Sequence, residues 1–225
     1  MKNIFLTCLV AAAVGVSAFN LAEPTGPEAP KLAHPAVADV MQNFKVVPAE
    51  SNITWIGRKV GGEHTGSVTL EGGTILIERS DLRGGTFLMD MRTITCKDLT
   101  DANSNARLVK HLKSDDFFSV EKNRTAMFAI TNLAPRQTAK ANTANYIVTG
   151  DLTIKGITNQ ISFPMYVKVR KGVATAKGTL KFDRTKWDIK YRSGNFFENL
   201  GDKAILDDIE LQIDIVAKEE TLAKK

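Results

Sequence analysis

The sequence predicts an all-β domain, and three observations favour this fold class. Apolar and polar residues alternate with a period of two in many segments, most clearly in 209–215, where isoleucine and leucine alternate with acidic and amide residues. Such alternation is typical of strands that bury one face. Turn signals that contain glycine separate these segments, and helical periodicity is scarce. Many short strands joined in a meander form an antiparallel barrel or a sandwich, and the alternation alone does not distinguish the two.

The other strands follow from the same alternation. Phe87, Met89 and Met91 lie on one face of an expected strand. Further strands are expected near residues 51–57, 66–71, 74–79, 126–132, 145–155, 160–170, 172–183 and 187–191. Turns are expected at residues 71–73, 83–85, 155–156 and 171–172, where glycine supports a reversal of the chain.

One or two short helices are expected between Asp98 and Lys113. Thr100 or Asp101 is a suitable N-cap, because a short oxygen-bearing side chain accepts hydrogen bonds from the first free amides of a helix. Ser114 is followed by two aspartates and indicates one more helical turn.

The chain is expected to have four parts. Residues 1–18 read as a secretory signal peptide, with Lys2 before an apolar run and small residues before a cleavage point after Ala18. Residues 19–42 hold four of the seven prolines and are expected to form a flexible linker. A single barrel domain is expected at 43–218, followed by a polar tail at 219–225. An exported protein, periplasmic or secreted, is therefore expected.

Charge and cysteine content exclude several classes of protein. The net charge of +5 falls to +4 once the leader is removed, and no basic cluster is interleaved with aromatic residues, so we expect no nucleic-acid partner. A transient contact with an anionic membrane surface is consistent with this charge. Cys96 is the only cysteine after the leader, and we expect an inert, buried thiol. The three histidines show no metal-ligand spacing and Cys96 is isolated in sequence, so no metal site is expected.

Catalytic patterns are weak. His111 is followed by Asp115 and Asp116, which suits a general base and a residue that orients it. No serine or cysteine occupies a nucleophile-elbow sequence, so we expect no catalytic residues and no catalytic cofactor. A hydrolase or isomerase that uses His111 is the less favoured alternative.

Five motifs occur in an order that matches a known family. They are Gly62–Gly66 (GEHTG), Gly85–Met91 (GTFLMDM), His111–Phe118 (HLKSDDFF), Gly150–Gly156 (GDLTIKG) and Asp183–Trp187 (DRTKW). From about Phe44 to about Lys218 the chain resembles the YceI-like proteins, which are periplasmic lipid- and polyisoprenoid-binding barrels. The resemblance implies an extended, lipocalin-like antiparallel β-barrel with a short helical segment near one end. It also implies a hydrophobic small-molecule ligand, a bound polyisoprenoid of the quinone or prenol type. Residues 51–64 keep only part of the family's early pattern, which leaves the identity of the lipid open.

The expected lipid-binding residues are of two kinds. Most are apolar side chains that face inward, and two are adjacent phenylalanines, whose large rings would be exposed to water in a solvated loop. They are Trp55, Phe87, Met89, Met91, Phe117, Phe118, Phe128, Gly150, Leu152, Ile154, Phe163, Gly178 and Phe182. Gly150 and Gly178 fall in inward registers and are expected to leave space for a ligand. The same residues would suit a filled core, so a structural or interaction module of the cell envelope is the alternative.

The polar head of such a lipid is expected at one end of the barrel. His111 and Lys113 are the candidate head-group contacts, because they adjoin the motif that carries the two phenylalanines. Arg184 is expected to pair structurally with Asp183 or Asp90 rather than to bind ligand.

Overall fold

The computed structural model of the chain describes residues 40–136, 140 and 142–220. The expected signal peptide and nearly all of the expected linker lie outside the described residues, as does most of the expected tail. The sheet begins at Gln42 and ends at Glu219, so it extends one residue past each expected boundary of the domain. In the described part of the chain, no helix combines the length and the apolar character that crossing a membrane would require.

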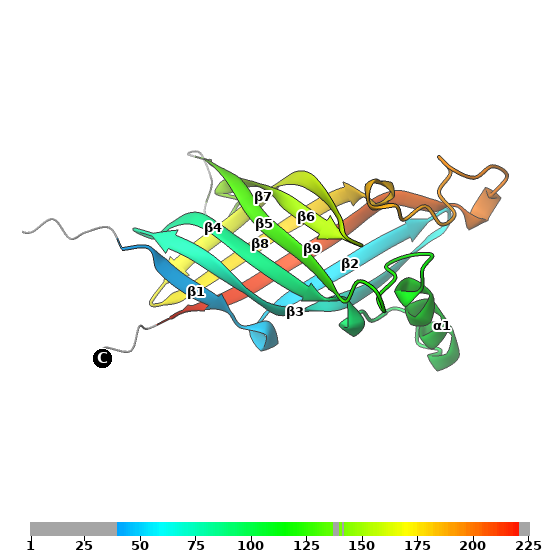
Figure 1. Ribbon diagram of the computed structural model, residues 1–225, viewed down its shortest axis with the longest axis horizontal. Coiled ribbons are helices and arrows are strands. Elements are labelled where there is room, and N and C mark those ends of the chain that lie inside the picture. The colour runs from blue at the N-terminus through cyan, green and yellow to red at the C-terminus, as the bar shows by residue number, and fades with distance from the viewer. Residues whose placement is uncertain (1–39, 137–139, 141, 221–225) are drawn as a thin grey trace, which may run out of the picture. The chain divides into compact units, whose positions relative to one another are not determined.

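Within the described residues, nine antiparallel strands form the domain, and Figure 1 shows their arrangement. They are β1 (Gln42–Val46), β2 (Asn52–Lys59), β3 (Gly62–Glu78), β4 (Asp81–Asp90), β5 (Thr125–Pro135), β6 (Tyr146–Ile154), β7 (Ile157–Arg170), β8 (Val173–Asp183) and β9 (Ile205–Glu219).

The sheet closes into a barrel with eight strand positions. The order β3-β2-β9-β8-β7-β6-β5-β4 returns to its start because β3 also pairs with β4. Strands β1 and β2 share one position, since each pairs with both β3 and β9, and the short 3₁₀ helix η1 (Pro48–Glu50) separates them. Because β3 and β4 pair, neither is a free edge strand of the sheet. The predicted antiparallel barrel is therefore confirmed, and the sandwich alternative is wrong.

Two of the four expected turns are confirmed. Lys155-Gly156 and Lys171-Gly172 each connect two strands directly. The φ values are 54° and 73° in the first turn and 51° and 71° in the second. Positive φ at both central residues matches the twist of the flanking strands, and glycine adopts it without strain.

The other two expected turns are wrong, because β3 and β4 run through their glycines. At Gly72 the register between β3 and β4 shifts by a bulge, and the chain reverses only at Arg79-Ser80. A Cβ atom at Gly73 would lie 2.5 Å from the Thr86 carbonyl oxygen, so glycine permits a close approach of the two strands at this point.

The expected strand at 187–191 is also wrong. This segment follows the 3₁₀ helix η3 (Arg184–Trp187), which ends at Asp188 in a left-handed conformation with φ 56°. Trp187 and Ile189 are both fully buried, and the indole N–H of Trp187 donates to the Leu152 carbonyl at 3.0 Å. The alternation therefore reflects alternate burial in an irregular segment. A period-two pattern does not distinguish such a segment from a strand.

The predicted helical segment is confirmed as α1 (Ala102–Lys113). Asp101 caps it by accepting from the Ser104 backbone N–H at 2.8 Å. Leu108 and Leu112 are on the side that meets the barrel interior. Figure 1 places α1 and the segment between β8 and β9, with its 3₁₀ helix η4 (Gly201–Lys203), at the same end of the barrel.

The barrel interior is filled over one part of its length only. Around β1, inward side chains are packed without solvent exposure, including Phe44, Ile75, Ile77, Val148, Ala174 and Ala217. None of these six residues contacts the cavity described below. The barrel therefore has a packed end and, near α1, a hollow end.

Candidate ligand-binding cavity

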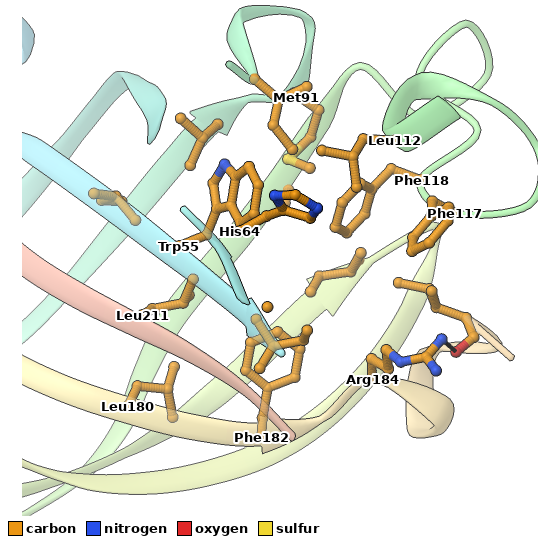
Figure 2. A pocket seen from close by; sticks show the side chains of 18 of the residues that line it. Trp55, His64, Met91, Leu112, Phe117, Phe118, Leu180, Phe182, Arg184 and Leu211 are labelled. Atoms are coloured by element: carbon orange, nitrogen blue, oxygen red, sulfur yellow. Dashed lines mark hydrogen bonds between the residues drawn. The ribbon is translucent and has the colours of Figure 1, made fainter. Parts of the chain in front are cut away.

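A cavity of about 390 Å³ occupies the hollow end of the barrel. This volume lies within the range of about 300–1,000 Å³ that is typical of small-molecule sites. Figure 2 shows its wall, with Trp55, Leu211 and Leu180 on neighbouring strands of one side, and Leu112, Phe117 and Phe118 toward the α1 end. The wall is predominantly apolar, and the charged lining residues come from strand ends and loops at the mouth.

Most of the predicted lipid-contacting residues line this cavity. They are Trp55, Phe87, Met89, Met91, Phe117, Phe118, Phe128, Leu152, Ile154, Phe163 and Phe182. The rings of Phe87 and Phe128 stack with centroids 6.4 Å apart, and Phe128 meets Phe163 at 5.7 Å. The two phenylalanines after α1 reach the cavity from a loop in which the Phe118 amide donates to the Leu112 carbonyl at 3.2 Å.

The expectation that Gly150 and Gly178 leave space for a ligand is wrong. Both glycines are in inward registers, but neither lines the cavity. A Cβ at Gly150 would lie 2.5 Å from the Phe128 ring, and one at Gly178 would lie 3.5 Å from the Phe163 ring. The neighbouring aromatic rings already fill the space that the missing side chains leave.

One cavity wall, on strand β9, was not among the predicted lipid-contacting residues. Ile209, Leu211 and Ile213 all line the cavity and are only partly buried, because they face its empty space. Their alternation was the clearest in the chain, but alternation identifies a buried face without showing whether that face meets packed atoms or a void.

His111 lies at the mouth of the cavity, as expected of a head-group contact. Its ring packs edge-on against Phe117 and Tyr191, with centroids 5.0 and 4.6 Å away, and its Nε2 lies 2.9 Å from Asp116 Oδ2. In the described part of the chain, no serine, threonine or cysteine side chain hydrogen-bonds to this ring. The histidine–carboxylate pair is present, whereas a nucleophile partner is not assembled with it.

Lys113 does not line the cavity, and its expected place beside His111 is wrong. It borders a different, more open hollow between α1 and the segment 92–96. Residues two apart on a helix point in different directions, so His111 and Lys113 are on different faces of α1.

A set of cations at the mouth was not predicted. Arg58 and Lys59 end β2, Arg192 lies in the loop after β8, and Lys203 ends η4; all four line the cavity, with Asp202 as the acidic residue among them. Within the described residues Lys59 and Lys203 form no ion pair, whereas Arg58 pairs with Glu63 and Glu210. These residues are far apart in sequence, so only the barrel topology brings them together.

Arg184 has the structural role that was expected, but with a different partner. Its guanidinium is 1% exposed and lies 3.0 Å from Asp207 Oδ1. It also donates to the backbone carbonyls of Ile189, Ile205 and Leu206. Burial lowers the pKa of Arg184, while the Asp207 charge opposes this effect. Asp90 pairs with Arg92 instead.

The expectation that Cys96 is isolated from potential metal ligands is wrong in three dimensions. His64 Nδ1 lies 2.8 Å from Asp98 Oδ2, and the Cys96 thiol donates to Asp98 Oδ1 at 3.3 Å. Burial opposes ionisation of Asp98, but hydrogen bonds from His64, the Thr65 amide and Cys96 outweigh it and lower its pKa to about 2. Burial raises the pKa of the Cys96 thiol. The three side chains form a compact cluster where β3 meets the segment that precedes α1.

Asp98 is expected to make the stability of the barrel sensitive to acid. A carboxyl whose pKa is lowered on folding stabilises the folded state above its unfolded pKa of about 3.9. That contribution is lost as the pH falls toward about 2. Urea unfolding between pH 7 and pH 2 should therefore show a steeper loss of stability in the wild type than in Asp98→Asn. Parallel curves for the two proteins would contradict this assignment.

Comparison with known proteins agrees with this architecture. The family model of the YceI-like domain matches residues 44–217. A UPF0312 protein of Photorhabdus laumondii is 29% identical over 121 residues, which cover 54% of this chain and 59% of the relative. A UPF0312 protein of Serratia proteamaculans is 33% identical over 73 residues, covering 32% of this chain and 35% of the relative. The matches thus span less than two thirds of either relative.

Two solved structures share the fold. BcnA of Burkholderia cenocepacia has a TM-score of 0.55 at 19% identity, covering 77% of this chain and 99% of that protein. A polyisoprenoid-binding domain from Saccharophagus degradans, implicated in plant cell wall breakdown, has a TM-score of 0.57 at 11% identity, covering 79% of this chain and 98% of that domain. Because the family model matches most of the chain, from β1 to β9, this protein belongs to the YceI-like family.

Proposed function

We propose that this protein binds an amphiphilic isoprenoid-type lipid without catalysis and carries or stores it outside the cytoplasm. One observation carries the proposal: a predominantly apolar cavity of about 390 Å³ inside the barrel, with its charged residues at the mouth. A filled structural core has no use for such a cavity, because empty space forfeits packing contacts. The Saccharophagus degradans domain of the same fold is described as polyisoprenoid-binding, which supports the same class of ligand here.

Burial of the tail supplies the affinity in this proposal. Each buried methylene contributes about 0.8 kcal/mol, and several isoprene units exceed the cost of ordering the chain. Because inward side chains such as Phe44, Ile75 and Ala217 fill the far end of the barrel, the tail enters and leaves through the mouth near α1. The methionines at 89, 91 and 165 adapt their shape to a branched guest.

The head of the lipid lies among the polar groups of the mouth. His111 and the cations Lys59 and Lys203 favour a quinone carbonyl, a hydroxyl or an anionic head. The proposed periplasmic or secreted location rests on the signal-peptide pattern of residues 1–18. An exported carrier that shields an insoluble tail in water requires no turnover and no catalytic cofactor.

Leu211→Trp is expected to weaken lipid uptake strongly while leaving the fold intact. Leu211 faces the cavity, so the larger ring fills empty space instead of displacing packed atoms. Cavity filling leaves stability unchanged or raises it by up to about 2 kcal/mol. The affinity for a long-chain isoprenoid quinone, measured by native mass spectrometry, should weaken at least tenfold.

Gln212→Trp is the matched control, because Gln212 is the next residue of β9 and points outward. It should bind the quinone like the wild type. If both variants bind normally, the cavity is not the lipid site. Ester or glycoside hydrolysis that His111→Ala stops would overturn the non-catalytic proposal.

A further inference from the structure

We propose that His64, Cys96 and Asp98 form a binding site for a divalent transition metal of the zinc class. The nitrogen, sulfur and oxygen donor atoms of these side chains all lie within 4.8 Å of one another. In tetrahedral zinc sites, bond lengths of about 2.0–2.3 Å place donors roughly 3.3–3.8 Å apart. Small side-chain adjustments therefore suffice to bring the three donors around one ion.

The backbone holds the three donors in place before any metal binds. His64 is on β3, and the segment with Cys96 and Asp98 pairs with the same strand. The Thr95 amide donates to the Ser67 carbonyl at 2.9 Å, and the Lys97 amide donates to the Thr65 carbonyl at 2.7 Å. Such preorganisation lowers the entropic cost of assembling a metal site.

Residues around the cluster supply outer contacts. Asn105 of α1 donates to the carbonyls of Cys96 and Leu99, each at 3.0 Å. Trp55 donates its indole N–H to the Thr95 carbonyl at 3.0 Å. These bonds anchor the cysteine-bearing segment from the helix on one side and from the barrel on the other. They act on the backbone of the segment and not on the ligating side chains, so their contribution is to hold the segment in place.

The present hydrogen bonds of the cluster correspond to its metal-free form. Asp98 accepts the Cys96 S–H and lies in hydrogen-bonding range of His64 Nδ1. On metal binding, the thiol loses its proton to solvent and a metal–sulfur bond forms. The His64 proton moves to Nε2 through exchange with water, which frees the Nδ1 lone pair for the ion. Asp98 remains ionised throughout and contributes a negative charge.

The donor set selects the class of metal. One thiolate, one imidazole and one carboxylate suit Zn²⁺ or Co²⁺, whereas Ca²⁺ and Mg²⁺ prefer oxygen ligands alone. Three protein ligands leave a position for water. Figure 2 shows the His64 ring beside Trp55 in the cavity, whereas Cys96 borders the open hollow next to α1, so the ion would lie between the two.

Cobalt titration of the reduced full-length protein tests the site. Co²⁺ bound to a thiolate gives a sulfur-to-metal charge-transfer absorption band, and Zn²⁺ should displace Co²⁺ and remove the band. Cys96→Ser should eliminate the band. His64→Gln should weaken Zn²⁺ binding in calorimetry by more than about 100-fold, because a lost ligand exceeds the effect of an outer partner.

Two matched controls separate this site from other histidines and thiols. His111→Gln alters a comparable histidine–aspartate pair with no thiol beside it, and it should retain the band and the affinity. Cys8→Ser removes the other cysteine of the chain and should also retain the band. Circular dichroism verifies that each variant is folded.

If folded wild-type protein shows no charge-transfer band with Co²⁺, the proposal is overturned. This result does not depend on whether any of the variants folds. Binding that persists in Cys96→Ser, or that disappears in His111→Gln, would overturn it as well. Loss of the metal site would leave the lipid proposal intact, because quinone uptake is measured separately.

Discussion

Arg184→Ala is expected to lower the free energy of unfolding by about 3–5 kcal/mol, as removal of one partner from a buried ion pair generally does. The side chain is 1% exposed. It forms an ion pair with Asp207 and donates hydrogen bonds to three backbone carbonyls. Within the described residues, Asp207 Oδ1 has no hydrogen bond of its own and depends on the nearby guanidinium. Among these residues, its removal leaves Asp207 without a cationic partner, and only Oδ2 keeps hydrogen bonds, from Ser193 and Asn195. Urea unfolding of the purified variant measures the loss.

Arg58→Ala is the matched control, because Arg58 also lies at the mouth of the cavity but is 34% exposed. Arg58 and Glu63 reach solvent, although Glu210 is 15% exposed, and the expected loss is below about 1 kcal/mol. The double variant Arg184→Met/Asp207→Asn should lose less stability than the two single variants combined, because it removes both charges. Equal losses for Arg184→Ala and Arg58→Ala would show that the buried pair does not stabilise the barrel.

Gly66→Ala is expected to destabilise the barrel by about 3 kcal/mol, at the upper end of the usual effect of overpacking. A Cβ at this position would lie 1.8 Å from the Thr95 carbonyl oxygen and 2.6 Å from the Trp55 indole. The carbonyl belongs to the backbone, so no rotamer change relieves the clash. The segment 94–98 must move away from β3, and thermal unfolding measures the consequence.

Gly72→Ala tests whether the effect is specific to the contact. Gly72 is on the same strand, and nothing lies within 4 Å of the position its Cβ would take. Alanine there should leave stability unchanged or raise it by up to about 1 kcal/mol, because it restricts the unfolded chain. If Gly66→Ala and Gly72→Ala lose similar stability, the contact with Thr95 is not the cause of the destabilisation.

Gly66→Ala should also weaken the proposed metal site. The displaced segment carries Cys96 and Asp98, whereas His64 stays on β3. The cobalt band should therefore diminish in this variant and persist in Gly72→Ala.

Local patterns in the sequence were sufficient to predict the fold class. Period-two alternation along 209–215 and 87–91 reflects which side chains leave water, and burial is the dominant driving force for each strand. The turns at Lys155-Gly156 and Lys171-Gly172 were predicted, and Asp101 was one of two candidate caps, because each feature depends on the conformation of a few adjacent residues.

Glycine was ambiguous, because it serves two purposes in a sheet. At Lys155-Gly156 it supports a positive φ, whereas at Gly73 and Gly66 it allows two backbones to approach. The second role depends on a partner far away in sequence, so the expected turn at 71–73 was wrong. The same limitation led to the expectation of free space at Gly150, where the Phe128 ring fills the gap.

Residue patterns were sufficient to identify the side chains that face inward, and the family resemblance implied the barrel that they line. Which part of that interior is packed and which is hollow followed from the tertiary structure alone, because packing depends on how side chains from all strands meet. It also brought Arg184 to Asp207 and His64 to Cys96. Such pairs follow from strand register and closure of the sheet, and neither is encoded in the spacing of residues along the chain.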